Sequence, residues 1–229
     1  MLSILIPAHN EEMFIEETLQ RVVAFSLGCE KEIIVINDGS TDNTGEVLRR
    51  LKNDFDFKLI EYKNNKGKGS AIKSGLDLVT GDLAIIQDAD LEYNPAEIPK
   101  LLNAMSADVA LVCGQRSSKV WPERGRHYVL GAKALTTFIN ILYGAKLRDA
   151  YTGYKLFNLK NVDINFLKNL ESSGFEFEAE VLCKIFKNSG KVVEVPINYK
   201  PRSKKEGKKI SFMDAVKGAI MTVKTKLKS

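Results

Sequence analysis

Apolar and polar positions alternate in a regular way along the first half of the chain. Short apolar runs predict buried strands, and the segments between them carry apolar residues at the three- and four-residue spacing of helices. The predicted strands are Leu2–Pro7, Glu32–Asn37, Phe57–Tyr62, Asp82–Gln87 and Val109–Cys113. The predicted helices are Glu11–Phe25, Thr41–Leu51, Ser70–Val79 and Pro95–Met105. Continuous apolar strands separated by helices predict an α/β fold, with a mostly parallel central sheet flanked by helices on both faces.

The pattern changes after Arg116, where a basic loop with the only Trp precedes an apolar helix. The remaining predictions are helices at Val129–Tyr143 and Phe175–Phe186, strands at Tyr151–Asn158 and Val192–Pro196, and a closing segment at Ser211–Lys228. Neither an internal repeat nor a linker is present. The sequence therefore predicts one domain over residues 1–229, of which 203–229 form a basic amphipathic C-terminal segment.

Polar clusters follow several of the predicted strands. In open α/β sheets, ligands bind beyond the carboxyl ends of the strands, so clusters at those ends predict one shared site. The clusters are His9–Glu12, Asn37–Asp42, Asn64–Ser70, Asp88–Glu92 and Gly114–Arg116.

Asp88, Asp90 and Glu92 come directly after the fourth predicted strand. In an extended segment this spacing places three carboxylates on one side, where a hard cation such as Mg²⁺ or Mn²⁺ is bound. Such a cation would bridge and stabilise a diphosphate. The alternative is a polar turn in which Asp88 or Asp90 caps the next helix. The apolar strand before the triplet and Pro95 just after it favour the metal.

Two other strand ends carry residues suited to a nucleotide. Asp38 is placed to bind a base or ribose, and Glu11 has the same option, although a turn or helix-start role explains both. The loop Asn65–Ser70 carries Lys66 and Lys68 beside a helix start, which favours a diphosphate. This loop is neither a Walker A motif, which needs Gly where Tyr62 stands, nor a dinucleotide-binding fingerprint.

Four arginines are candidate phosphate ligands, because guanidinium binds phosphate oxygens in a bidentate manner. The alternative is that they are ordinary solvated charges. They are Arg116, Arg124, Arg126 and Arg202.

Composition and charge limit the class of protein. Three widely spaced cysteines form neither a disulfide framework nor a zinc motif, which favours a reducing, cytoplasmic location. We expect neither a signal peptide nor a membrane span. The net charge is +5, and the excess of Lys and Arg after Tyr199 suits an anionic surface, nucleic acid or lipid, or is simply solvated.

The closing segment has an apolar stripe with lysines beside it. The stripe packs onto the domain in one interpretation, and in the other it forms an interfacial helix on an anionic membrane. The apolar stripe consists of Phe212, Val216, Ala219, Ile220, Val223 and Leu227.

Eight motifs in order, covering nearly the whole chain, resemble family 2 glycosyltransferases with the GT-A fold. The similarity is greatest to the branch of dolichol-phosphate mannose and polyprenyl-phosphate sugar synthases. The motifs are Ile6–Glu12, Ile36–Thr44, Asn65–Gly75, Asp88–Glu92, Gly114–Arg116, Asp149–Phe157, Phe175–Glu180 and Val193–Arg202.

The resemblance implies a nucleoside-diphosphate-sugar donor, Mg²⁺ or Mn²⁺, and inversion at the anomeric carbon. By position, the nucleotide-sugar is bound by Pro7, Ala8, Glu11, Asp38, Lys68 and Asp88. Asp88, Asp90 and Glu92 form the metal site, and Arg116 and Arg202 face the transferring phosphates. This branch commonly has Gln where Glu92 stands, and its Arg-x-x-Gly-x-Ser-Lys element is altered at Arg202–Ser211. Because of these departures, the resemblance does not identify the acceptor.

The expected function is sugar transfer from UDP- or GDP-sugar to polyprenyl (dolichyl or undecaprenyl) phosphate, by an enzyme peripheral to the inner membrane face. A phosphate is already anionic near neutral pH and needs little base catalysis. The alternative is elongation of a saccharide on a hydroxyl acceptor, for which Asp149 is the predicted general base. A nucleotide-sugar sensor and a nucleotidyltransferase are weaker alternatives. We expect no nucleic-acid partner, and the sequence does not indicate an oligomeric state.

Overall fold

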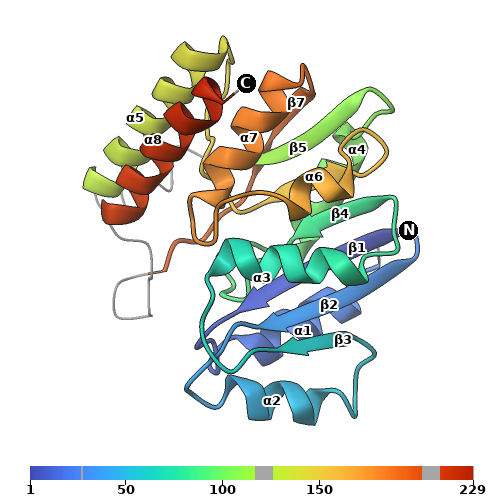
Figure 1. The fold of residues 1–229 in the computed structure, drawn as a ribbon. Helices are drawn as coiled ribbons and strands as arrows, with labels where there is room; N and C mark the ends of the chain where they lie inside the picture. Colours follow the sequence, from blue (N-terminus) through green and yellow to red (C-terminus); the bar gives the residue numbers. More distant parts are fainter. Residues whose placement is uncertain (27, 117–125, 203–211, 229) are drawn as a thin grey trace.

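The computed structural model describes residues 1–26, 28–116, 126–202 and 212–228 (Figure 1). The strands are β1 (Leu2–Ala8), β2 (Lys31–Asn37), β3 (Lys58–Glu61), β4 (Leu83–Ile86), β5 (Val109–Arg116), β6 (Lys155–Asn158) and β7 (Lys191–Ile197). The helices are α1 (Ile15–Ala24), α2 (Thr44–Leu51), α3 (Lys68–Gly75), α4 (Ile98–Ala104), α5 (Arg126–Tyr143), α6 (Ile164–Lys168), α7 (Phe177–Lys187) and α8 (Phe212–Leu227). Short 3-10 turns, η1 (Leu76–Leu78) and η2 (Pro95–Glu97), follow α3 and precede α4.

The described strands form one sheet in the order β3-β2-β1-β4-β6-β5-β7. Each neighbouring pair is parallel except the two pairs made by β6, which runs antiparallel to both β4 and β5. The prediction of a mostly parallel sheet flanked by helices is confirmed. The reversed strand β6 has one consequence for the site: its first residue, Lys155, lies at the end of the sheet where the parallel strands finish.

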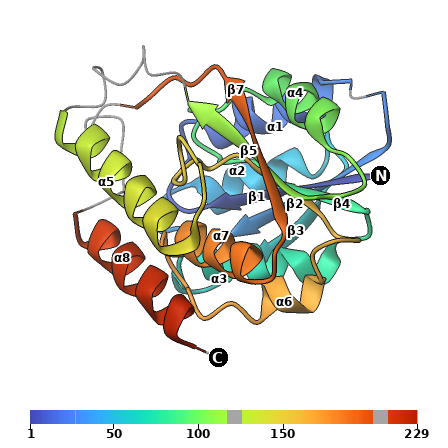
Figure 2. The same ribbon diagram turned by 90° about the horizontal axis from the view of Figure 1, so that it is seen from above.

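Helices cover both faces of the sheet, which divides the core in two (Figure 2). On one face α1, α2 and α4 pack against alternate residues of β1 such as Ile4 and Ile6. On the other face α3, α5, α6 and α7 pack against Leu5 and the intervening positions. Because both faces are covered, the strands read as continuous apolar runs, which explains why the sequence predicted them well.

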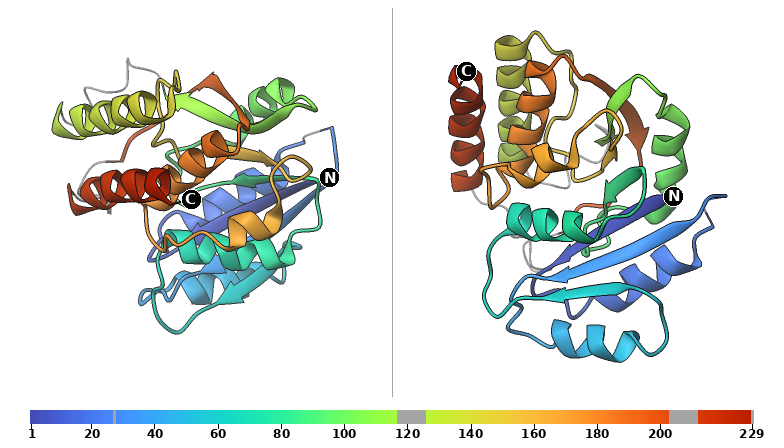
Figure 3. Two further views of the ribbon diagram at one scale, coloured as in Figure 1. Left: turned by 45° about the horizontal axis from the view of Figure 1, so that its top comes forward. Right: turned by 45° about the vertical axis from the view of Figure 1, so that its right-hand side comes forward.

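Helix α8 forms an outer layer on α7 and α5 (Figure 3). It packs through small and hydroxyl residues: Thr222 and Thr225 are 0% and 4% exposed, and Gly218 is also buried. Ile220 and Leu227 of the predicted stripe are 61% and 78% exposed. The interpretation that the stripe packs onto the domain is therefore wrong for these residues. Small residues let α8 approach α7 and α5 closely, which turns part of the apolar stripe outward.

Some predicted boundaries differ from the structure. The helix predicted from Glu11 begins at Ile15, because Asn10 has a positive φ of 52° and the chain turns before the helix starts. Helix α6 was not predicted, since five residues are too few to show a periodic pattern. Among the described residues, no helix is both long and apolar enough to cross a membrane.

Candidate active site

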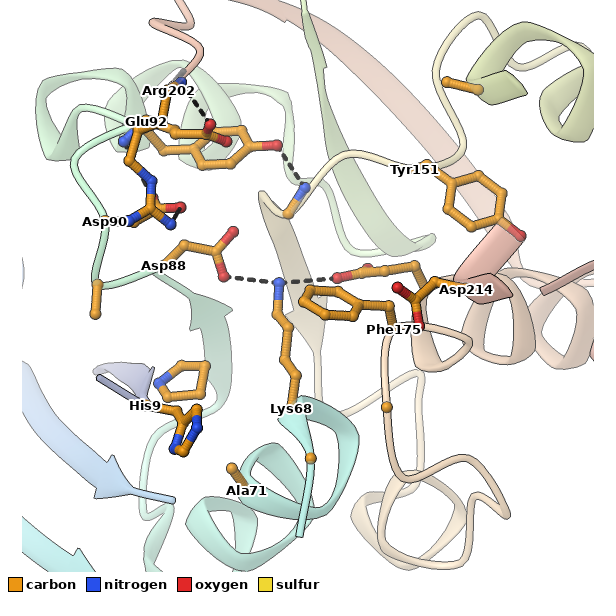
Figure 4. Close-up of a pocket in the computed structure, with 18 of the residues that line it drawn as sticks. His9, Lys68, Ala71, Asp88, Asp90, Glu92, Tyr151, Phe175, Arg202 and Asp214 are labelled. Carbon is orange, nitrogen blue, oxygen red and sulfur yellow. Dashed lines mark hydrogen bonds and ion pairs between the residues drawn. The ribbon is translucent and has the colours of Figure 1, made fainter. Parts of the chain in front are cut away.

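A cavity of about 1000 Å³ lies beyond the carboxyl ends of β1, β2 and β4 (Figure 4). This volume is at the upper end for small-molecule sites. The cavity collects residues from most of the chain, and ten of the predicted site residues line it. Those residues are Pro7, Ala8, Glu11, Asp38, Lys68, Asp88, Asp90, Glu92, Arg116 and Arg202. Asp149 and Lys66 do not line it, and Arg124 and the side chain of Arg126 lie outside what the structure describes.

Asp38 joins the strand end of β2 to the loop before α3. Its two carboxylate oxygens accept hydrogen bonds from the backbone N–H groups of Lys66 and Gly67, each at 2.8 Å. Gly39 has a positive φ of 64°, and any side chain there would collide with the backbone at Asn64. Asp38 is 2% exposed and also lines the cavity. Its hydrogen bonds hold in place the loop at which the sequence predicted a diphosphate site.

Lys68 stands between two carboxylates at the centre of the cavity. Its Nζ lies 2.7 Å from Oδ1 of Asp88 and 3.2 Å from Oε1 of Glu178. Burial alone would lower the pKa of Lys68, but Asp88 and Glu178 outweigh burial and raise this pKa above its usual value. Figure 4 shows Lys68 reaching from α3 toward Asp88. The site therefore holds a charged lysine where the strand ends converge.

The acidic triplet is not extended, and this part of the prediction is wrong. The chain turns at Ala89 and Asp90, and Leu91 has a positive φ of 59°. Each carboxylate therefore meets a different partner. Asp88 contacts Lys68, Asp90 lies 2.7 Å from the Arg202 guanidinium, and Glu92 accepts bonds from the Tyr199 hydroxyl and the Arg202 backbone N–H.

The triplet was also predicted as a metal site. In the described part of the chain, no three His, Cys, Asp or Glu side chains are arranged to hold a metal ion. The donor chemistry nevertheless fits a hard divalent cation, because all three carboxylates line the same cavity and carboxylate oxygens are the ligands such ions prefer. Burial and the neighbouring charges of Asp88 and Glu92 raise the pKa of Asp90 to about 7, against the opposing effect of Arg202. A second positive charge beside Asp90 would relieve this crowding.

Arg202 crosses the cavity mouth between two distant segments. Its guanidinium lies 2.9 Å from Glu11, which follows β1, and 2.7 Å from Asp90, which follows β4. Glu11 and Arg202 are 191 positions apart in the sequence. A cation from the C-terminal part of the chain therefore balances two carboxylates from the N-terminal half.

Arg116 and Asp149 form a buried bidentate pair. Nε and one terminal nitrogen of Arg116 each lie 2.6 Å from an oxygen of Asp149, and the two residues are 4% and 2% exposed. Burial would raise the pKa of Asp149, but Arg116 outweighs burial and lowers this pKa. Arg116 lines the cavity, and Asp149 lies behind it. Asp149 thus orients Arg116 in this structure.

The opposite wall of the cavity is mostly apolar. It is built from α5 and the loops before β6 and α7, and Asp214 of α8 stands at its edge (Figure 4). Leu130 both lines the cavity and is 65% exposed, so the cavity opens on the side of α5. The other lining residues here include Ala134, Leu135, Tyr151, Phe175 and Ala215.

Sequence reasoning assigned no role to several residues that shape this site. Lys155 is fully buried and contacts Glu178. Gly153 lies so close to Asp88 that a methyl group on Gly153 would be 2.2 Å from Oδ2 of Asp88. A signal for Lys155 was present, because a lysine inside the apolar strand β6 must find a buried partner. Glu178 gave no such signal, since acids are common in a first helical turn.

Comparison with known proteins identifies relatives over most of the chain. Residues 3–163 match the sequence profile of Glycosyl transferase family 2. The chain is 31% identical over 212 residues to the dolichol-phosphate mannosyltransferase of Pyrococcus furiosus, covering 90% of this chain and 58% of that protein. It is 27% identical over 222 residues to the dolichyl-phosphate beta-glucosyltransferase of Saccharomyces cerevisiae, covering 86% and 66%. The chain thus spans less than two thirds of the length of these relatives.

Among solved structures, the fold is similar to glucosyl-3-phosphoglycerate synthase from Mycobacterium tuberculosis in complex with Mn²⁺, UDP and phosphoglyceric acid. The TM-score is 0.75 at 20% identity, covering 99% of this chain and 78% of that one. At this identity the likeness shows a shared fold.

Proposed function

Because the chain belongs to glycosyl transferase family 2 and has the GT-A fold, we propose that it transfers a sugar from UDP- or GDP-sugar to a polyprenyl phosphate, with inversion at the anomeric carbon. The observation that carries this proposal is the cavity, which has a charged wall at the strand ends and an apolar wall on α5. A nucleotide-sugar suits the first wall, and a phosphate on an apolar chain suits the second. The names of the two relatives, both dolichol-phosphate enzymes, support this choice of acceptor.

At the donor end, Pro7, Ala8, Glu11 and Asp38 bind the nucleoside in this proposal. Lys68 offers its charge to the diphosphate, because it is the lysine of the Asn65–Ser70 loop that lines the cavity. Asp88 orients Lys68 at 2.7 Å and lies beside the reacting sugar.

A divalent cation, Mg²⁺ or Mn²⁺, completes the proposed site. Asp90 and Glu92, with Asp88, would hold it, and their carboxylate oxygens are the ligands such ions prefer. When bound, it supplies positive charge for the departing nucleoside diphosphate. The neighbouring structure in complex with Mn²⁺ and UDP supports this assignment. Arg202 must then exchange its contact with Asp90 for another anion, for which the transferring phosphates are the proposed partners.

The acceptor end needs a group that binds a phosphate rather than one that removes a proton. Arg116 presents a permanent charge to the cavity, and Asp149 fixes its orientation through two bonds of 2.6 Å. With both oxygens on Arg116 and a lowered pKa, Asp149 is poorly suited to act as a general base. The geometry therefore favours the phosphate acceptor over the hydroxyl acceptor.

We place the acceptor at an anionic membrane, which the protein contacts from the cytoplasmic side through what we term the α5–α8 surface. This surface consists of the exposed apolar residues of two adjacent helices, with exposed lysines nearby. The apolar residues are Leu130, Ile141, Met213, Ile220, Val223 and Leu227. The lysines include Lys133, Lys217 and Lys226, each of which adds about 1 kcal/mol of attraction near acidic lipid. Leu130 belongs both to this surface and to the cavity, so a lipid-linked phosphate has a path to the site.

The test is a panel of UDP- and GDP-sugars with Mn²⁺ or Mg²⁺ and three acceptor conditions: none, undecaprenyl or dolichyl phosphate, and phosphoglycerate. Nucleotide release and glycolipid formation are both measured. We expect glycolipid with one donor and the polyprenyl phosphate. If product forms with phosphoglycerate and not with polyprenyl phosphate, the acceptor is a soluble phosphate rather than a lipid. Nucleotide binding without release under any condition would contradict the catalytic role.

A further inference from the structure

We propose that Lys155 is a positioning residue for the donor diphosphate: it neutralises Glu178, so that Lys68 keeps its charge for the donor. This inference rests on the proposed function and adds a role for two residues that do not touch the substrate. It follows from a row of four alternating charges, Lys155, Glu178, Lys68 and Asp88, of which the first two are buried and the last two are partly exposed at the cavity.

The first member of the row is held in one place. Lys155 is fully buried, and its Nζ lies 2.5 Å from Oε2 of Glu178 and 2.5 Å from the carbonyl oxygen of Thr152. A third contact, to the carbonyl oxygen of Ala150, is 3.4 Å long. With acceptors on three sides and no exposed atom, Lys155 itself has no access to a ligand. Its charge acts on the cavity only through its neighbours.

Glu178 is shared between two lysines. Its Oε2 lies 2.5 Å from Lys155, and its Oε1 lies 3.2 Å from Lys68. The shorter contact is to the residue that cannot reach a ligand. Because the Coulomb attraction grows as distance falls, Glu178 is attracted more strongly by Lys155 than by Lys68. Lys68 is therefore bound more loosely on this side than on the side of Asp88, and it can accept a further anion.

The net charge of the row changes from zero to negative when Lys155 is removed. Two lysines and two carboxylates sum to zero, whereas one lysine and two carboxylates leave a negative charge beside the place where a diphosphate must enter. Glu178 would then draw Lys68 away from Asp88. Removing Glu178 instead leaves a surplus positive charge. The two members of one ion pair thus have opposite predicted effects on an anionic ligand, which loss of a structural contact alone would not produce.

The experiment compares affinities for nucleoside diphosphate and monophosphate by calorimetry, using UDP, UMP, GDP and GMP at fixed Mg²⁺ with the full chain. The variants are Lys155→Met, Glu178→Gln and the double variant. We expect Lys155→Met to lower the diphosphate-to-monophosphate affinity ratio about tenfold, and Glu178→Gln to maintain or raise it. The double variant should return to within about threefold of the parent, because both charges are lost together.

Lys191→Met is the matched control, since it removes a lysine from the exposed ion pair with Asp108 and should leave the ratio unchanged. If Lys155→Met does not fold, the double variant and Glu178→Gln still decide, because replacing a buried pair as a unit is commonly tolerated. An unchanged ratio in Lys155→Met, or a lowered ratio in Glu178→Gln, overturns the inference. Failure of the parent to bind either diphosphate overturns the proposed function instead.

Discussion

The strand-end wall of the cavity and the α5–α8 surface depart from the usual distribution of residues in opposite ways. At the strand ends, charged groups that normally lie in water are buried: Asp38, Arg116 and Glu178 are all less than 5% exposed. On α5 and α8, apolar groups that normally lie inside are exposed, with Ile141 at 75% and Leu227 at 78%. One region buries charge, and the other exposes hydrocarbon.

The comparison shows what each region is built to meet. Burial of a charge costs several kcal/mol unless other charges or hydrogen bonds compensate, so such groups are retained where a charged ligand enters. A contiguous exposed apolar surface is costly in water and marks contact with an apolar partner. The acceptor proposed here, a charged phosphate on a hydrocarbon chain, has both properties. In the proposed function, the charged wall suits the phosphates of donor and acceptor, and the α5–α8 surface suits the hydrocarbon chain of the acceptor.

The largest effect is expected on the charged wall. Asp90→Asn should lower turnover about 100-fold, because the site loses one carboxylate charge of the proposed metal site. The fold should remain, since Asp90 lies in a turn at the cavity rather than in the core. Nucleotide release with Mn²⁺ and the thermal unfolding midpoint measure the two effects.

Asp108→Asn is the matched control, because Asp108 is an exposed acid paired with Lys191 far from the cavity. Full activity of Asp90→Asn, or activity of the parent that persists in EDTA, would show that the metal assignment is wrong.

A smaller effect is expected on the α5–α8 surface. The double variant Ile220→Glu/Leu227→Glu should reduce sedimentation with anionic liposomes at least about tenfold. Two apolar side chains that would enter the lipid are lost, and the two new negative charges cancel the attraction of two lysines to the lipid headgroups. Its thermal midpoint should match the parent, since both residues are exposed. Truncation of α8 would be a poorer test, because Thr222 and Thr225 are buried against the domain.

Met13→Glu serves as the control, since Met13 is 78% exposed but lies outside the α5–α8 surface. A parent protein that does not sediment with these liposomes at low salt excludes the membrane contact altogether.

The smallest effect concerns a partly buried carboxylate outside the proposed site, at the opposite ends of the strands. Glu32 accepts hydrogen bonds from Ser3, Lys58 and Thr80. Burial would raise its pKa, but these bonds outweigh burial and lower the pKa to about 2. Glu32→Gln should lower the free energy of unfolding by about 1 kcal/mol at pH 7 and leave turnover unchanged.

The sign follows from the folded pKa of Glu32 lying below its ordinary value of 4.5. The carboxylate stabilises the fold fully above about pH 4.5, and this contribution is lost as the pH falls toward 2. Denaturant titrations of parent and variant at pH 7 and pH 2.5 measure it. A difference in stability that does not shrink at low pH would contradict the assignment.

The sequence predicted the first half of the fold because its rules are local. Apolar runs at Leu2–Pro7 and Glu32–Asn37 identify buried strands, and in a parallel sheet their ends must meet, which brought Asp38 and Asp88 to one site. The direction of β6 was not predictable in this way, since a buried strand such as Lys155–Asn158 has the same pattern whichever way it runs. Periodicity likewise predicted helix α8 but not which of its faces packs.

The partners within the site depended on distant pairings. Nothing local indicates that Arg202 meets Glu11 and Asp90, or that Lys155 meets Glu178. The bend at Leu91 was missed for a different reason. Leucine rarely adopts a positive φ, so the sequence of the triplet does not indicate that its three carboxylates point to different partners.

The reversed strand β6 also constrains the order in which the protein can be assembled. Strands β1 to β4 are complete by residue 86, but the outer edge of β4 has no partner until residues 155–158 arrive. Among the described residues, strands β5 and β7 join the rest of the sheet through this four-residue segment. An unpaired apolar edge is prone to self-association, and it persists here for about 70 residues of synthesis, or several seconds at ordinary translation rates. Pairing of Lys155–Asn158 with β4 thus covers the exposed edge of the first four strands and completes the sheet.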